Sequence, residues 1–259
     1  MKPLILITND DGIDSPGLLA MAEAVSDIGE LLIVAPATQQ TSMGRAFPRT
    51  EKLGIIQKKE LLIGGKKQCG YGIYSSPAYV VDYSVLELTE REPDICLSGI
   101  NYGENLGTNL TCSGTVGAIL EASTYQIPGI AFSIPSDIKI QRSQRYLEIN
   151  WTDAKKVVRY WTEKLLDEKE ICGTKWLNIN MPEIIPPPQE YCYTKQSAQN
   201  YFGSLKPEKR DFSKRYEFTT IIGYQEKDLD IKDDIYAVCV RKKTSVTPII
   251  HDLTIPELR

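Results

Sequence analysis

The chain has 259 residues, 42% of them hydrophobic and 25% charged, and its 30 Lys and Arg against 34 Asp and Glu give a formal net charge of −4. This composition is that of an ordinary globular protein and excludes a disordered or fibrous chain. A mildly acidic chain has no overall attraction to nucleic acids or anionic lipid, so we expect neither a nucleic-acid polymer nor a membrane as partner.

No segment of the sequence has the length of a membrane span, which needs roughly 18 apolar residues. The apolar run at residues 4–7 passes directly into Asn-Asp-Asp and is too short for a secretory signal. We therefore expect a cytoplasmic protein.

Apolar strands alternate with helical patterns along the first half of the chain. In chain order the pattern predicts a strand at 4–7, a helix at 17–29 that stops at Gly29, a strand at 31–36, a helix at 76–89, a strand at 93–99, a helix at 115–126 and a strand at 127–133. Strands without polar alternation are typical of a parallel sheet covered on both faces. The predicted fold is an open α/β sheet, with ligands beyond the carboxyl ends of its strands.

The second half of the chain is less regular. The pattern predicts a surface helix at 151–168, a strand at 175–182, a proline-rich connector or sheet edge at 183–190, hairpins forming an arm within 191–230, and a last strand followed by a turn at 234–249.

Several reaction types lack the residues they need. The six cysteines contain no C-x-x-C pair and His251 is the single histidine, which disfavours a zinc site and a Ser-His-Asp triad. Asn9 stands two residues before Asp11, where a phosphoaspartate mechanism needs a second Asp. The sequence also lacks a P-loop, a dinucleotide fingerprint and a nucleophile elbow. We therefore expect chemistry based on oxygen ligands.

Two adjacent carboxylates, Asp10 and Asp11, follow the first strand. In a turn both can converge on one point, where they repel unless a proton or cation lies between them. A hard divalent ion such as Mg²⁺ or Mn²⁺ suits them. The structural alternative is an Asx-turn followed by an N-cap near Ser15-Pro16.

Three further polar groups follow predicted strands or begin a helix. Asn101 offers a neutral oxygen ligand in the loop SGINYGENLGTN, and Thr41 and Ser42 supply hydroxyls in TQQTSMGRA. Ser113, Gly114 and Thr115 begin a helix, whose N-terminus favours a phosphate-sized anion, although a simple Ser/Thr N-cap is the alternative there. A metal, an anion site and neutral oxygens at one sheet edge favour metal-assisted hydrolysis of phosphate esters.

The chain also resembles a known family, the SurE stationary-phase survival 5'/3'-nucleotidases. The resemblance covers residues 5 to 249 and rests on the segments TNDDGIDSPG, IVAPATQQTS, PDICLSGINYGENLG, CSGTVGA, IPGIAFS, LNINMP and SVTPI. It implies a divalent-metal-dependent acid phosphatase that acts on nucleoside 5'- and 3'-monophosphates and in some members on short polyphosphate. It also implies one Rossmann-like domain over 1–259, with a core at 1–135 that carries the metal site. Residues 136–259 would complete the sheet and form a β-rich extension exchanged within a homodimer or homotetramer.

The resemblance assigns roles position by position. The metal ligands are Asp10, Asp11, Thr41 and Asn101, and the residues around the phosphate are Asn9, Ser113, Gly114 and Thr115. This chain departs from the family in having Thr41 for the usual Ser, with Ser42 as the alternative ligand, Asn109 where Asp is frequent, Cys112 for Tyr, and Tyr79 where an acid is common.

The expected mechanism is attack of a metal-activated water in line on phosphorus, without a covalent intermediate. Asp11 is favoured over Asp10 as the acceptor of the water's proton, but the sequence does not assign that role. The rival function is a non-catalytic, stress-regulatory module that binds a metal and a nucleotide.

Overall fold

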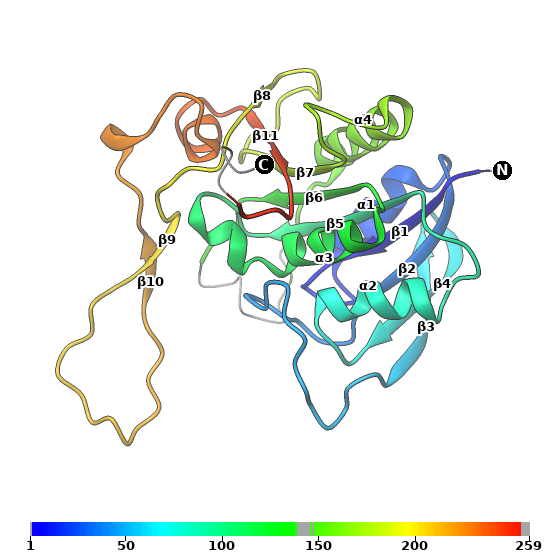
Figure 1. The fold of residues 1–259 in the computed structure, drawn as a ribbon, viewed down its shortest axis with the longest axis horizontal. Helices are drawn as coiled ribbons and strands as arrows, with labels where there is room; N and C mark the ends of the chain where they lie inside the picture. The colour runs from blue at the N-terminus through cyan, green and yellow to red at the C-terminus, as the bar shows by residue number, and fades with distance from the viewer. Residues whose placement is uncertain (1, 139–145, 147, 255–259) are drawn as a thin grey trace.

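A nine-stranded sheet forms the centre of the protein (Figure 1). The computed structural model describes residues 2–138, 146 and 148–254. The strands of this sheet are β1 (Leu4–Thr8), β2 (Glu30–Pro36), β3 (Ile56–Ile63), β4 (Lys66–Ile73), β5 (Ile95–Tyr102), β6 (Gly129–Ile134), β7 (Trp176–Asn180), β8 (Tyr191–Tyr193) and β11 (Thr244–Ile249). Their order is β3-β4-β2-β1-β5-β6-β7-β11-β8. Only β3 with β4 and β7 with β11 pair antiparallel among the described strands of this sheet, so the predicted, mostly parallel α/β sheet is confirmed.

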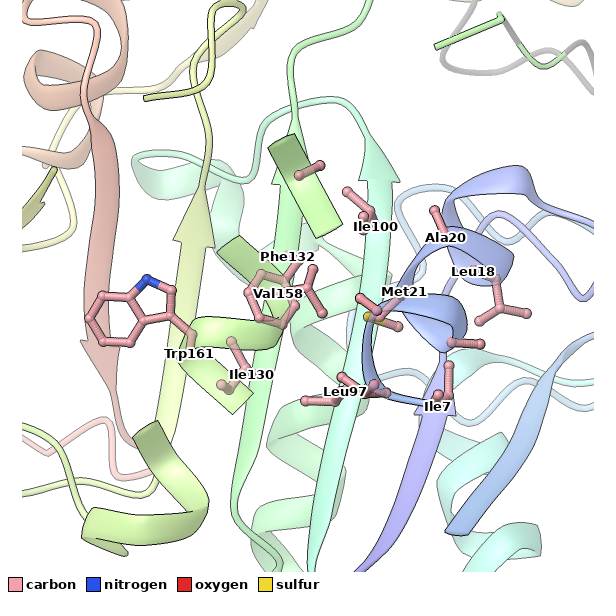
Figure 2. Close-up of a cluster of buried hydrophobic side chains, with 14 of the residues drawn as sticks. Ile7, Leu18, Ala20, Met21, Leu97, Ile100, Ile130, Phe132, Val158 and Trp161 are labelled. Atoms are coloured by element: carbon pink, nitrogen blue, oxygen red, sulfur yellow. The ribbon is translucent and has the colours of Figure 1, made fainter. Parts of the chain in front are cut away.

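Helices cover both faces of the sheet. They are α1 (Pro16–Val25) and α4 (Thr152–Glu168) on one face, and α2 (Pro77–Leu86) and α3 (Gly114–Ala122) on the other. All five residues of β1 are buried, because alternate side chains enter the two cores. Figure 2 shows the first core, where Ile7, Leu97 and Phe132 of the sheet pack with Met21 of α1 and Val158 of α4.

Helix α1 begins as the sequence predicts but ends early. Ser15 is its N-cap residue, and Pro16 occupies the first turn. An N–H there would have no partner within the helix, so its absence in proline removes no hydrogen bond. The helix ends at Val25, four residues before the predicted stop at Gly29. Gly29 instead lets two chain segments approach closely, because a Cβ there would lie 2.5 Å from the Pro3 carbonyl oxygen.

The C-terminal part contains the predicted arm and one element that the sequence misplaces. Strands β9 (Phe202–Ser204) and β10 (Thr220–Ile222) form an antiparallel hairpin whose long loop projects from the body (Figure 1). The prediction of a continuous strand from residue 234 is wrong, because Tyr236–Val240 forms a π-helical turn and β11 starts only at Thr244. A short apolar run fits a buried helical turn as well as a strand.

None of the helices in the described ranges is long and apolar enough to cross a membrane.

Candidate active site

The turn after β1 is shaped by the side chain of Asn9. Its Nδ2 donates to the Gly12 carbonyl oxygen and its Oδ1 accepts from the Gly12 N–H, each over 3.0 Å. Gly12 has φ of +106°, a conformation that L side chains rarely adopt. The predicted Asx-turn is therefore present, and it presents Asp10 and Asp11 side by side at the end of the strand.

Asp10 lies against the N-terminus of α3. Its Oδ1 accepts from Thr115 Oγ1 over 2.8 Å, and the backbone N–H groups of Gly114 and Thr115 also bond to its carboxylate. A Cβ on Gly114 would lie 2.8 Å from Asp10 Oδ2, so only glycine fits this contact. Ser113 is the N-cap and accepts from the Val116 N–H over 3.1 Å. The structure thus joins the predicted N-cap to the predicted acidic turn.

Asp11 connects the turn to the other two polar loops. Its Oδ2 accepts from the Tyr102 N–H and its Oδ1 from Gln39 Nε2, both over 3.3 Å. The Asp10 carbonyl oxygen accepts from the Gln40 N–H over 2.7 Å. Strands β2, β1 and β5 are neighbours in the sheet, so the loops that follow them meet.

Both carboxylates are almost fully buried, with 5% of Asp10 and 4% of Asp11 exposed. Burial raises the pKa of Asp10, against the hydrogen bond from Thr115. Burial also raises the pKa of Asp11, and the neighbouring charge of Asp10 raises it further. Two such carboxylates are ionised together only if a cation compensates them.

One cavity of about 840 Å³ connects most of the predicted site. Asp10, Thr41, Ser42, Asn101 and Ser113 all line it. The Asn101 amide donates from Nδ2 to the Gly103 carbonyl oxygen over 2.7 Å, which leaves its Oδ1 as the end suited to a cation. The other four predicted residues are not part of the lining. Asn9, Gly114 and Thr115 support it from behind, and Asp11 follows Asp10 in the same turn, with its carboxylate hydrogen-bonded to the Tyr102 N–H.

The donor set fits a hard divalent ion held partly by water. Nowhere in the described ranges do three or more His, Cys, Asp or Glu side chains gather as a metal site. An ion here would bind the two carboxylates together with neutral oxygens, and Mg²⁺ commonly keeps several waters beside one or two carboxylates. The two buried carboxylates with raised pKa values are the observation that supports this fit.

A buried amide network that the sequence analysis missed holds the loop after β5. The Asn105 N–H donates to Asn180 Oδ1 and its Nδ2 to Ser133 Oγ, both over 2.8 Å. Its carbonyl oxygen accepts from Asn178 and Asn180 over 2.8 and 3.1 Å. The available signal was the pair of polar residues inside the buried strand β7. Asn105 lines the cavity, so the network fixes part of its wall.

The loop after β2 is fixed on α3. Arg45 Nε lies 2.6 Å from Glu121 Oε2, and 6% of the Glu121 side chain is exposed. A Cβ on Gly117 would lie 2.2 Å from the Gly44 carbonyl oxygen, so the backbones are in close contact. Arg45 therefore anchors the loop that carries Thr41 and Ser42.

Comparison with known proteins identifies the family. The family model described as "Survival protein SurE" matches residues 5–203. A protein of Thermococcus kodakarensis named "5'-nucleotidase SurE" is 33% identical over 250 residues, which cover 96% of this chain and 93% of the relative. A protein of the same name from Methanosphaera stadtmanae is 32% identical over 252 residues, covering 96% of this chain and 95% of the relative. The crystal structure of the SurE protein from Aquifex aeolicus matches with a TM-score of 0.74 and 28% identity, covering 99% of this chain and 96% of that one. From its first strand to its C-terminal extension, this chain belongs to the SurE family.

Proposed function

We propose that this protein is a divalent-metal-dependent phosphatase that hydrolyses nucleoside 5'- and 3'-monophosphates to nucleoside and phosphate. The observation that carries the proposal is the contact between Asp10 and the N-terminus of α3, which joins a buried carboxylate pair to an anion-binding helix end. The relatives named 5'-nucleotidase support the same activity. Short polyphosphate is a further candidate substrate.

The proposed metal ligands are Asp10, Asp11, Asn101 and a hydroxyl of Thr41 or Ser42. A bound Mg²⁺ or Mn²⁺ would offset charge on the phosphate and lower the pKa of a water. Asp10 and Asp11 are also the proposed catalytic residues, because either buried carboxylate could accept the proton that the attacking water must lose.

The phosphate is proposed to lie at the N-terminus of α3. Ser113 lines the cavity and would contact the phosphate directly. Gly114 and Thr115 would act through their hydrogen bonds to Asp10, and Asn9 through the turn that it shapes. Two candidates stand for the proton acceptor: Asp10 lines the cavity, whereas Asp11 binds a proton more readily because burial and the charge of Asp10 both raise its pKa.

The projecting hairpin suggests how subunits associate. Its loop exposes large apolar side chains, including 87% of Phe212, 52% of Leu205 and 51% of Phe218. Apolar groups of this size favour contact with another protein surface. We therefore propose a homodimer or homotetramer in which the C-terminal extension is exchanged through the loop of this hairpin beyond β9 and β10, and light scattering at several protein concentrations tests the association. All six cysteines are unpaired, which is usual in the reducing cytoplasm, where we place the activity.

Phosphate release from a panel of nucleoside 5'- and 3'-monophosphates and short polyphosphate tests the function. Each substrate is assayed with Mn²⁺, with Mg²⁺ and with EDTA. We expect release from the monophosphates that requires metal. Absence of release with either metal, together with nucleotide binding that persists, would contradict the hydrolase and favour a non-catalytic nucleotide-binding module.

A further inference from the structure

The cavity extends beyond the proposed catalytic groups to the base of the hairpin. Its far wall is formed by residues of β9 and β10, among them Phe202, Ser204, Thr220 and Ile222. These four residues supply an aromatic, an aliphatic and two hydroxyl side chains, and Glu217 from the loop between β9 and β10 also lines the cavity. The near end is lined by carboxylate and amide groups, including those of Asp10 and Asn101. A cavity of about 840 Å³ is within the range of sites that hold a whole small ligand.

Phe202 is held in its position in this wall by a backbone hydrogen bond and a ring contact. Its backbone N–H donates to Asn109 Oδ1 over 2.8 Å, which ties β9 to the chain segment just before Ser113. Its ring packs edge-on against Tyr201, with ring centroids 4.7 Å apart and an interplanar angle of 73°. Phe202 itself is half-buried and lines the cavity. One side of the ring is therefore supported, and the residue still presents surface to a ligand.

Tyr201 is itself fixed from two directions. It stacks on Tyr224 with centroids 5.8 Å apart and planes 10° apart, and its hydroxyl donates to Glu104 Oε1 over 2.6 Å. Only 6% of Tyr201 is exposed. This support places Phe202 before any ligand arrives, which reduces the entropy lost on binding.

The charges of the lining indicate what the far end accepts. Among the described residues that line the cavity there is no Lys or Arg, while four are acidic: Asp10, Glu104, Asp137 and Glu217. A second phosphate group therefore finds no Lys or Arg among the described residues of the lining. A flat, uncharged ring suits the wall better, because aromatic side chains stack on the face of any base.

We propose that Phe202 is the stacking surface for the nucleobase of the substrate, and so determines the preference for nucleotides over other phosphate monoesters. The proposal rests on the function proposed above, with the phosphate at Ser113 and the base at β9. Because every base offers a π face, Phe202 selects for the presence of a base more than for its identity.

Steady-state kinetics with paired substrates test the proposal. Adenosine 5'-monophosphate and ribose 5-phosphate share the reacting phosphate and sugar, and only the first has a base. We expect Phe202→Ala to lower kcat/KM for the nucleotide by about 5- to 150-fold, mainly through KM. Ribose 5-phosphate should be hydrolysed as by the wild type, and Phe202→Trp should restore the nucleotide preference. The matched control is Phe212→Ala, which removes an exposed ring of the same hairpin that does not line the cavity. Any effect of this variant through subunit association should be equal for the two substrates.

Two results would overturn the proposal: equal losses for both substrates, which indicate a structural role, or no loss for either. Equilibrium binding of adenosine gives a readout that does not need turnover. If wild type releases no phosphate but adenosine binding still depends on Phe202, the stacking surface stands and the hydrolase function fails. If adenosine binds Phe202→Ala as tightly as wild type, the stacking surface is refuted whatever the activity.

Discussion

Asp234 connects the loop after β5 to the C-terminal segment through three backbone hydrogen bonds. Its Oδ2 accepts from the Gly107 N–H over 2.9 Å, and its Oδ1 accepts from the N–H groups of Ser197 and Ile235 over 3.0 and 2.8 Å. The side chain is fully buried. The substitution Asp234→Asn keeps its shape but turns one of the two acceptors into a donor.

The cost follows from the hydrogen bonds that remain possible. If the asparagine oxygen faces Ser197 and Ile235, its amide group faces the Gly107 N–H, and two donors meet without an acceptor. An unsatisfied buried donor lowers the free energy of unfolding by about 1–3 kcal/mol. For a chain of this size, that corresponds to a fall in Tm of about 2–12 °C. Since Gly107 belongs to the loop that follows Asn101 and the end of β5, phosphate release should fall as well.

Thermal unfolding at one fixed protein concentration measures the effect, because oligomers have concentration-dependent Tm values. The matched control is Asp230→Asn, which removes the same charge from an exposed residue that pairs with Lys195 over 2.8 Å. The control should unfold near the wild-type temperature. If Asp234→Asn is as stable and as active as this control, the connection through Gly107 does not stabilise the site.

Three further predictions concern α3 and its neighbours. Gly114→Ala places a methyl group 2.8 Å from the Asp10 carboxylate. This overpacking should lower the free energy of unfolding by about 1–3 kcal/mol and remove most phosphate release. A variant with the wild-type Tm and turnover would contradict the prediction. Arg45→Met removes a charged hydrogen bond to Glu121 and should lower the free energy of unfolding by about 1–3 kcal/mol. Arg45→Lys should recover part of that stability when its thermal unfolding is measured under the same conditions. Burial raises the pKa of Asp82 to about 6, so the folded state holds its proton more tightly than the unfolded state. Relative to Asp82→Asn, the free energy of unfolding of the wild type should therefore fall as pH rises from about 4 to about 6. Urea unfolding in which it rises over this range would refute the raised pKa of Asp82.

The part of the fold that the sequence predicts is the part with strong local patterns. Strands β1, β2, β5 and β6 each contain a run of consecutive apolar residues, because helices cover both of their faces. The hairpin of β3 and β4 was not predicted. β3 is the edge strand of the sheet, with exposed and charged positions that hide its periodicity, and the local signal was the turn at Gly64-Gly65, both of which have positive φ.

In the candidate site, too, some contacts are predictable from local sequence patterns and others are not. The meeting of Asp10, Asn101 and Ser113 was predictable because strand ends of one parallel sheet lie at a common edge. The contribution of Phe202 was not, since its hydrogen bond to Asn109 joins residues 93 positions apart. Contacts at that separation depend on how the hairpin folds back, which no local pattern records.

The most direct test of the site is phosphate release by Asp10→Asn compared with Asp14→Asn, in the presence of limiting Mn²⁺. Asp10 is buried at the N-terminus of α3, whereas Asp14 lies four residues later with 63% of its side chain exposed. We predict that Asp10→Asn folds but loses most of its phosphate release, while Asp14→Asn keeps the wild-type rate. Full turnover by Asp10→Asn would show that the buried carboxylate pair is not the catalytic centre.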